Sequence, residues 1–413
     1  MKVPLRSQTR SHPRTVPLRK LQTRYRDLRL TVEHHRGPLT AVALSIRAGA
    51  RFDGRHPGLA HAAEHMLFQR TRNLDYRRLT ELAADLGGHH NAVTRYETIT
   101  LIIECFNEDV EKALWLLSEQ YYHAAIEEER WEVERRVVMD ELRGFESDPV
   151  QLLEETAFCR FFRGALAHPI AGTARSLKKL SAQHIRDFLG QHFVHGATSL
   201  GVAGGIEPDR ILKLAEKFFC GGPKPIPKPP PVEPGRVVVL RRHEQGTVGY
   251  VTLLLEAPAA PRDFFAAAVA LEVLGDGPDT RLFQEIRGRL GLGYTVDTGS
   301  MWGPDWAVFV IGASCPPDQV KLLRKTIESI CADAAAWGFD KSEIERARKK
   351  LKFNYALLGN SLFDRAIALA EDCVLGFPLP EEAEDMISGF TDEEVEDAWR
   401  QVWLGRKLAA LLT

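Results

Sequence analysis

The segment that decides the fold is Gly58-Leu-Ala-His-Ala-Ala-Glu-His-Met-Leu-Phe, in which helix-forming residues surround His61, Glu64 and His65. Residues three and four positions apart share one face of an α-helix, so both imidazoles and the carboxylate point the same way. Two neutral imidazoles on one helical turn can hold a zinc ion. The carboxylate beside them can accept a proton from a metal-bound water. This HxxEH pattern, the inverse of HExxH, predicts a catalytic metal site on a helix.

A second helical segment can supply the third ligand that a catalytic zinc site needs. The stretch 129–146 is acidic and contains Glu134 and Glu141, which are seven residues apart. Seven residues make two helical turns, so the two carboxylates share a face. A solvated, charged helix would have the same composition. The spacing alone therefore leaves both interpretations open.

The composition is that of an ordinary globular protein. The chain has 413 residues, of which 44% are hydrophobic and 27% charged, and its net charge is −2. That length predicts two large domains. A charge so close to zero predicts no general attraction to nucleic acid or to a membrane surface. No apolar run approaches the roughly 20 residues that a membrane helix needs, so we expect no membrane-spanning segment.

The cysteines and the N-terminus bear on the compartment. The six cysteines are scattered and never form CxxC, which favours a reducing compartment with free thiols, and hence the cytoplasm. The first 26 residues contain eight Lys or Arg and no Asp or Glu. An Arg-rich start can be a mitochondrial transit peptide. Pro4, Pro13 and Pro17 would interrupt its helix, so we expect a basic flexible tail over residues 1–24.

A proline-rich stretch divides the chain into two halves. Residues 221–235 contain seven prolines and predict an extended, semi-rigid linker between a domain at 25–220 and a domain at 236–413. Each half begins with strand-like sequence and continues with long helical patterns. The expected strands are 28–34, 40–48, 236–242 and 247–255, and the expected helices include 127–145 and 341–358. The fold class is therefore α+β, with two domains that each pack helices on an antiparallel-rich sheet.

The two halves also resemble each other. Lys179-Leu-Ser-Ala-Gln-His-Ile-Arg-Asp-Phe resembles Gly389-Phe-Thr-Asp-Glu-Glu-Val-Glu-Asp-Ala at an offset of 210, and Val133-Glu-Arg-Arg resembles Ile344-Glu-Arg-Ala at an offset of 211. Two matches at nearly one offset predict a duplicated domain. The second offset places Lys352 opposite Glu141. A shared Leu-Phe-Gln places Asp276, Asp279 and Thr280 opposite the HxxEH residues. A cationic Lys cannot ligate zinc, so we expect one zinc ion per chain.

The whole constellation resembles a known family. HxxEH followed 76 residues later by Glu141, itself seven residues after Glu134, is similar to the zinc peptidases of the pitrilysin, insulin-degrading enzyme and mitochondrial processing peptidase family, the inverzincins. The resemblance implies that His61, His65 and Glu141 bind zinc. It also implies that Glu64 is the general base and that Glu134 supports a ligand. It covers nearly the whole chain and implies a half-length, bacterial-type subunit built of two homologous α+β domains.

Two further elements extend the resemblance. Thr280-Arg-Leu-Phe-Gln-Glu-Ile-Arg-Gly-Arg-Leu-Gly-Leu-Gly-Tyr is similar to the family's RLFxxLRExxGLAY element, which implies that Arg287 and Tyr294 stabilise the negative charge that develops on the substrate oxygen. Leu86-Gly-Gly-His-His-Asn-Ala-Val-Thr is similar to its GGxxNAxT edge strand. That match implies that Asn91 and Ala92 bind the substrate backbone as an added strand.

The function implied by this resemblance is zinc-dependent cleavage of unstructured peptides, or of leader or presequences, in an enclosed chamber. The chain carries both the metal residues and the Arg/Tyr pair. We therefore expect a homodimer with two composite sites, in which each site combines the metal residues of one subunit with the Arg/Tyr pair of the other. Two alternatives stay open: a catalytic subunit that needs a different partner subunit, as a heterodimer, and a non-catalytic scaffold. We expect peptide substrates, and neither nucleic acid nor a membrane as a partner.

Overall fold

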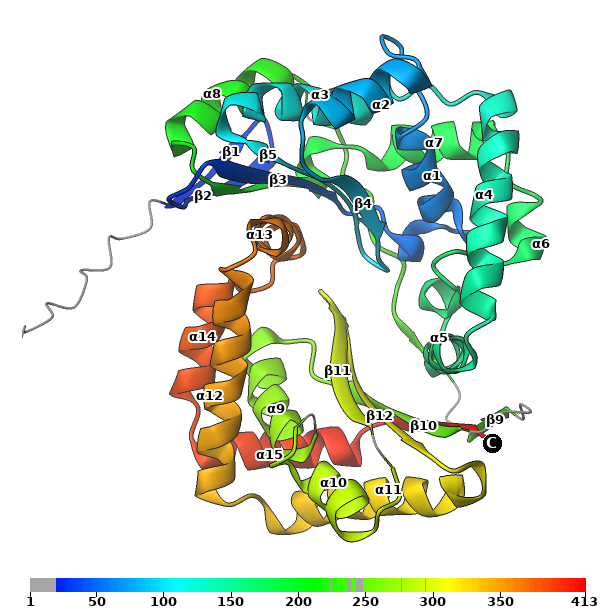
Figure 1. Cartoon of the computed structure of the whole chain (residues 1–413), viewed down its shortest axis with the longest axis vertical. Coiled ribbons are helices and arrows are strands. Elements are labelled where there is room, and N and C mark those ends of the chain that lie inside the picture. Colours follow the sequence, from blue (N-terminus) through cyan, green and yellow to red (C-terminus); the bar gives the residue numbers. More distant parts are fainter. Residues whose placement is uncertain (1–19, 223, 236–238, 243–247, 276, 294) are drawn as a thin grey trace, which may run out of the picture.

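The computed structural model describes residues 20–413, except 223, 236–238, 243–247, 276 and 294 (Figure 1). The first half has a six-stranded sheet with the order β1-β2-β7-β3-β5-β4. Its strands are β1 (Lys20–Tyr25), β2 (Leu28–His34), β3 (Leu39–Ile46), β4 (His90–Thr94), β5 (Ile99–Phe106) and β7 (Thr198–Gly204). Its helices are α1 (Leu59–Leu67), α2 (Tyr76–Asp85), α3 (Val110–His123), α4 (Glu128–Glu146), α5 (Pro149–Phe161), α6 (Ala174–Leu177), α7 (Ala182–His192) and α8 (Pro208–Phe218).

The second half has a five-stranded sheet with the order β11-β12-β10-β13-β9. Its strands are β9 (Leu240–Arg242), β10 (Gly249–Ala257), β11 (Val296–Gly303), β12 (Trp306–Cys315) and β13 (Lys407–Leu412). Its helices are α9 (Pro261–Leu274), α10 (Arg281–Phe283), which continues as a π-helix over Gln284–Arg289, α11 (Val320–Trp337), α12 (Lys341–Leu358), α13 (Leu362–Leu375), α14 (Pro380–Gly389) and α15 (Asp392–Leu404).

The two sheets share one topology, which confirms the predicted fold class of two duplicated α+β domains. Strands β2, β7, β3, β5 and β4 of the first sheet have the same neighbours as β9, β13, β10, β12 and β11 of the second. In both sheets the first of these pairs is parallel and the other three are antiparallel. The expected helices over 127–145 and 341–358 are α4 and α12, within one residue at each end.

The topology corrects the residue alignment between the halves. Helix α9 follows β10 as α1 follows β3, so α9 occupies the place of the HxxEH helix and the segment around Asp279 lies after it. Buried Trp131 and Glu134 of α4 match buried Ile344 and Ala347 of α12 at an offset of 213, not 211. The shared Leu-Phe-Gln was misleading, because a match of only three residues, two apolar and one amide, occurs by chance on unrelated helices. Among the described residues, only the first half holds a cluster of three potential metal ligands.

In each half, one helix packs on the sheet of the other half. Helix α13 of the second half packs on β7 and β3, whereas α5 of the first half packs on β13 and β10 (Figure 1). The backbone of α13 approaches closely because Gly201 of β7 has no side chain; a Cβ there would lie 2.4 Å from the carbonyl oxygen of Ala366. The apolar cluster beneath α13 joins both halves and contains Ala41, Ala43, Ile102, Ala203, Ala366, Leu369, Ala370 and Leu379. Burial of these faces stabilises the arrangement of the two halves.

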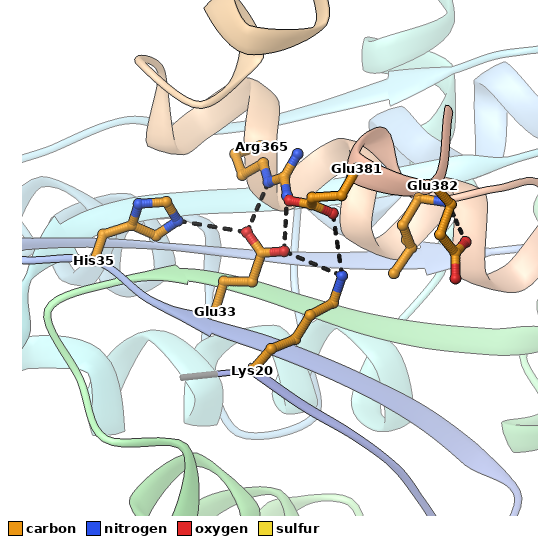
Figure 2. A network of polar contacts seen from close by, with 7 residues as sticks. Lys20, Glu33, His35, Arg365, Glu381 and Glu382 are labelled. Carbon is orange, nitrogen blue, oxygen red and sulfur yellow. Dashed lines mark hydrogen bonds and ion pairs between the residues drawn. The ribbon is translucent and has the colours of Figure 1, made fainter. Parts of the chain in front are cut away.

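Buried ion pairs reinforce this contact. Arg365 of α13 donates two hydrogen bonds of 2.7 Å to the Glu33 carboxylate of β2, and both side chains are almost fully buried. Figure 2 shows that Lys20, His35 and Glu381 surround this pair. A second cluster centres on Arg51, which is fully buried. Arg51 donates to Glu97, to Asp305 of the second half and to the carbonyl oxygen of Pro230.

The structure differs from the expected boundaries in two places. Lys20–Tyr25 form β1 and pair with β2, so the sheet begins before the expected end of the basic tail; residues 1–19 lie outside the described residues. The charged residues of β1 face outward in alternation with half-buried ones, which hides the strand among basic residues. In the proline-rich segment, Glu233–Pro234 pair with Phe162–Arg163 of the first half. None of the described helices is long and apolar enough to cross a bilayer.

Candidate metal centre

A buried carboxylate fixes the N-terminus of helix α1. Asp53 accepts hydrogen bonds from the backbone N–H groups of Gly58 and Ala60, both at 2.7 Å. The first N–H groups of a helix have no partner inside it, so an outside acceptor stabilises its start. Gly58 adopts φ = 88°, and a Cβ there would lie 2.8 Å from the carbonyl oxygen of Ala171. Sequence reasoning missed Asp53, because this residue lies six positions before the helix, whereas a capping residue is expected directly before it, where Gly58 stands.

The HxxEH helix and helix α4 bring three potential ligands together. The Nε2 atoms of His61 and His65 are 3.3 Å apart. One carboxylate oxygen of Glu141 lies 3.7 Å from His61 Nε2 and the other lies 3.3 Å from His65 Nε2. Two ligands bound to a tetrahedral ion at roughly 2.1 Å are about 3.4 Å from each other. The spacing of these donor atoms therefore fits a zinc ion between them.

Glu134 holds one of these imidazoles in place. Its Oε1 lies 2.9 Å from His65 Nδ1, and only 9% of Glu134 is exposed. A carboxylate that accepts the Nδ1 proton leaves Nε2 unprotonated, and it also fixes the orientation of the ring. Nδ1 of His61 is buried and has no hydrogen-bond partner among the described residues. The two imidazoles are therefore supported in different ways.

The pKa values of the three α1 residues are shifted in different directions. Burial and the neighbouring His65 lower the pKa of His61 to about 4, so its imidazole is neutral at pH 7 and can ligate a cation. Burial alone would lower the pKa of His65, but the hydrogen bond to Glu134 and the nearby carboxylates outweigh it and raise this pKa. Burial raises the pKa of Glu64. A carboxylate with a raised pKa accepts a proton more readily than an exposed one.

Strand β4 lies at the edge of the first sheet and contacts α1. It carries Asn91, which is exposed, and Ala92, which is buried and pairs with Leu101 of β5. Its last residue, Thr94, donates a hydrogen bond of 2.5 Å from its hydroxyl to Glu64 Oε2. Thr94 belongs to the edge-strand motif of the sequence, but its contact with the HxxEH helix depends on how the sheet packs and was not predicted.

Arg287 lies apart from the metal residues within the chain. Arg287 is exposed on the π-helix that follows α10, and its guanidinium lies 5.1 Å from the centre of the Phe283 ring. Figure 1 shows α10 at the outer end of the second half and α1 in the first half. Tyr294 lies outside the described residues. The fold of one chain therefore does not bring Arg287 to His61, His65 and Glu141.

Family models match both halves of the chain. The model described as Insulinase (Peptidase family M16) matches residues 29–174, and the model described as Peptidase M16 inactive domain matches residues 179–351. The chain belongs to peptidase family M16. The M16 match in the first half includes α1 and α4. The match named for an inactive domain begins at residue 179 of the first half and extends to residue 351 of the second, where the described residues hold no metal cluster.

Relatives of this M16 chain include proteins named as proteases. An uncharacterized zinc protease of Rickettsia felis is 27% identical over 323 residues, which cover 76% of this chain and 77% of the relative. Human mitochondrial-processing peptidase subunit beta is 26% identical over 340 residues, which cover 76% of this chain and 68% of the relative. The crystal structure of a protease from Helicobacter pylori superimposes with a TM-score of 0.88 at 19% identity and covers 96% of this chain and 99% of the other. That likeness shows the same fold.

Proposed function

We propose that this M16 chain is a zinc-dependent endopeptidase that hydrolyses unstructured peptides, including leader or presequences. The observation that carries the proposal is the tetrahedral spacing of the donor atoms of His61, His65 and Glu141, with Glu64 on the same helix turn. A structural role alone would not require two imidazoles and a carboxylate to converge at these distances.

Each residue has a chemical role in the proposed reaction. A zinc ion held by the three ligands would lower the pKa of a water molecule and polarise the peptide carbonyl. Glu64 accepts a proton from that water and then returns it to the leaving amine. Glu134 keeps the His65 imidazole oriented throughout, because its hydrogen bond occupies Nδ1.

The substrate would bind as an extended strand along β4. Within the described part of the sheet β4 pairs only with β5, so its other edge can accept a strand. A cavity of about 470 Å³ between the halves begins near Phe145, one helical turn beyond Glu141. Its lining combines apolar side chains with the acidic Glu154, Glu155 and Asp297 and with the polar Gln151, Thr298 and Ser300. Backbone pairing reads little sequence, so broad specificity for peptides is expected.

We further propose a homodimer in which Arg287 and Tyr294 of one subunit complete the site of the other. The separation of α10 from α1 within the chain supports this arrangement (Figure 1). The alternative is a heterodimer with a related subunit. The likeness to a processing-peptidase subunit supports this alternative. The six free cysteines support a reducing compartment, for which the cytoplasm is our proposal.

Hydrolysis of a mixed library of unstructured peptides tests the function. The purified protein is compared with Glu64→Gln, each with and without a chelator. Cleavage that the chelator and the substitution both abolish, with about one zinc per chain in both proteins, is the expected result. Zinc without cleavage would replace the homodimer with the heterodimer proposal. If the protein binds no zinc and cleaves no peptide, the peptidase proposal is rejected and a scaffold is favoured.

A further inference from the structure

Thr94 connects two parts of the proposed site that are distant in the sequence. Its hydroxyl donates a hydrogen bond of 2.5 Å to Glu64 Oε2. The contact joins the last residue of edge strand β4 to the HxxEH helix, thirty positions earlier in the chain. A hydrogen bond to one oxygen restricts the movement of a carboxylate and so helps to position its other oxygen.

The hydrogen-bond register of β4 shows which groups lie at its open edge. Glu104 N donates to His89 O, and Arg95 N donates to Thr98 O, so residues 89 and 95 turn their backbone groups toward β5. In an antiparallel pair, successive residues alternate between facing the partner strand and facing away. The backbone groups of Ala92 and Thr94 therefore face away from β5, toward the edge where a substrate strand would pair.

We propose that Thr94 is a positioning residue that ties the general base Glu64 to the strand edge where the substrate pairs. An extended peptide on this edge would bond to the backbone at Ala92 and Thr94 and so would fix the position of Thr94. The hydroxyl then holds the Glu64 carboxylate in register with the bound peptide. The inference rests on the proposed function, since it assigns Thr94 a part in the same reaction.

Kinetics of two substitutions test this role in the zinc-loaded protein. Thr94→Val keeps the shape of the side chain but removes the donor, and it should lower kcat by roughly 10- to 100-fold, as expected for one lost hydrogen bond to a charged group. KM and zinc content should change little. Thr94→Ser keeps the hydroxyl and should restore most of kcat. Thr23→Val, a threonine on β1 at the opposite edge of the same sheet, is the matched control and should behave as the unchanged protein.

Other kinetic results would overturn the proposal. A higher KM with unchanged kcat would make Thr94 part of the peptide-binding surface only. Loss of zinc, or equal defects in Thr94→Val and Thr94→Ser, would indicate a structural role. Unchanged kcat and KM would remove Thr94 from the reaction.

A double-mutant cycle on stability tests the contact without any turnover. Urea unfolding of the metal-free protein is measured for Thr94→Val, Glu64→Ala and the double variant, because Ala leaves no acceptor for the Thr94 hydroxyl. If the two side chains interact, the double variant loses less stability than the two single losses combined. Additive losses would refute the contact itself. Coupled losses in a protein that cleaves no peptide would instead refute the proposed function, so the two failures are distinguishable.

Discussion

Replacement of Arg365 by Met should destabilise the contact between the two halves by about 3 kcal/mol. The Arg365 guanidinium forms two bonds of 2.7 Å with Glu33, whose side chain is 1% exposed. Met fills a similar volume but leaves the Glu33 carboxylate buried with weaker partners, Lys20 at 3.3 Å and His35 at 3.5 Å. Removal of one partner from a buried pair typically costs about 3–5 kcal/mol.

The pKa of Glu33 gives an independent magnitude. Burial alone would raise this pKa, but the contact with His35, the hydrogen bonds from Arg365 and the nearby positive charges lower it from 4.5 to about 2. A shift of this size corresponds to about 3 kcal/mol. Because the folded-state pKa is lowered, this stabilisation is present above pH 4.5 and disappears as the pH falls toward 2. Loss of Arg365 should therefore also weaken the dependence of stability on pH in that range.

Urea unfolding at several pH values provides the assay. Arg365→Met should lose about 3 kcal/mol of unfolding free energy at pH 7, whereas Arg136→Met, on the exposed face of α4, should lose less than about 0.5 kcal/mol. Glu33→Gln combined with Arg365→Met should be more stable than Arg365→Met alone, since no lone charge stays buried. Equal stabilities of the two single arginine variants, or an unchanged pH dependence in Arg365→Met, would refute this reasoning.

The remaining predictions concern the metal centre. Glu134→Gln should weaken zinc binding by roughly 10- to 100-fold in a chelator competition, because it replaces the carboxylate that orients His65; the exposed Glu129→Gln should have no effect, and equal affinities would disprove the role. The metal-free protein should lose up to about 3 kcal/mol of stability between pH 6.5 and 4. The reason is that the pKa of His61 is lowered to about 4 in the folded protein, so the unfolded chain takes up the proton first as the pH falls. His61→Gln should reduce this loss, and an equal dependence of the unfolding free energy on pH in both proteins would contradict the prediction. Asp53→Ala should destabilise the protein by about 2 kcal/mol, measured by urea unfolding, because two N–H groups at the start of α1 lose their acceptor. A loss below about 0.5 kcal/mol, the size expected for a surface change, would argue against this cap. Glu64→Gln and Arg287→Ala, each inactive alone, should recover activity when mixed if the sites are composite, and no recovery despite proven subunit exchange would reject that arrangement.

Local patterns identified much of the fold and part of the site. The i, i+3, i+4 spacing of His61, Glu64 and His65 depends only on helix geometry, so it was readable directly, and α4 and α12 follow from helical periodicity. Strand β1 was not predicted, because its alternating exposed positions include charged residues, which made the strand resemble the basic tail. Of the two matches between the halves, the one at offset 210 is confirmed, since Ser181 and Thr391 both cap a helix, whereas the one at offset 211 was wrong by two residues.

By itself, the sequence determined the helices, the duplication and the metal-ligand types, because these depend on neighbours along the chain. Only the tertiary structure decided that Glu141 reaches both imidazoles, that Thr94 holds Glu64, and that α5 and α13 cross to the sheet of the other half. Each of these contacts joins segments far apart in the chain. Their geometry results from the packing of whole elements on apolar faces, and no local pattern encodes it.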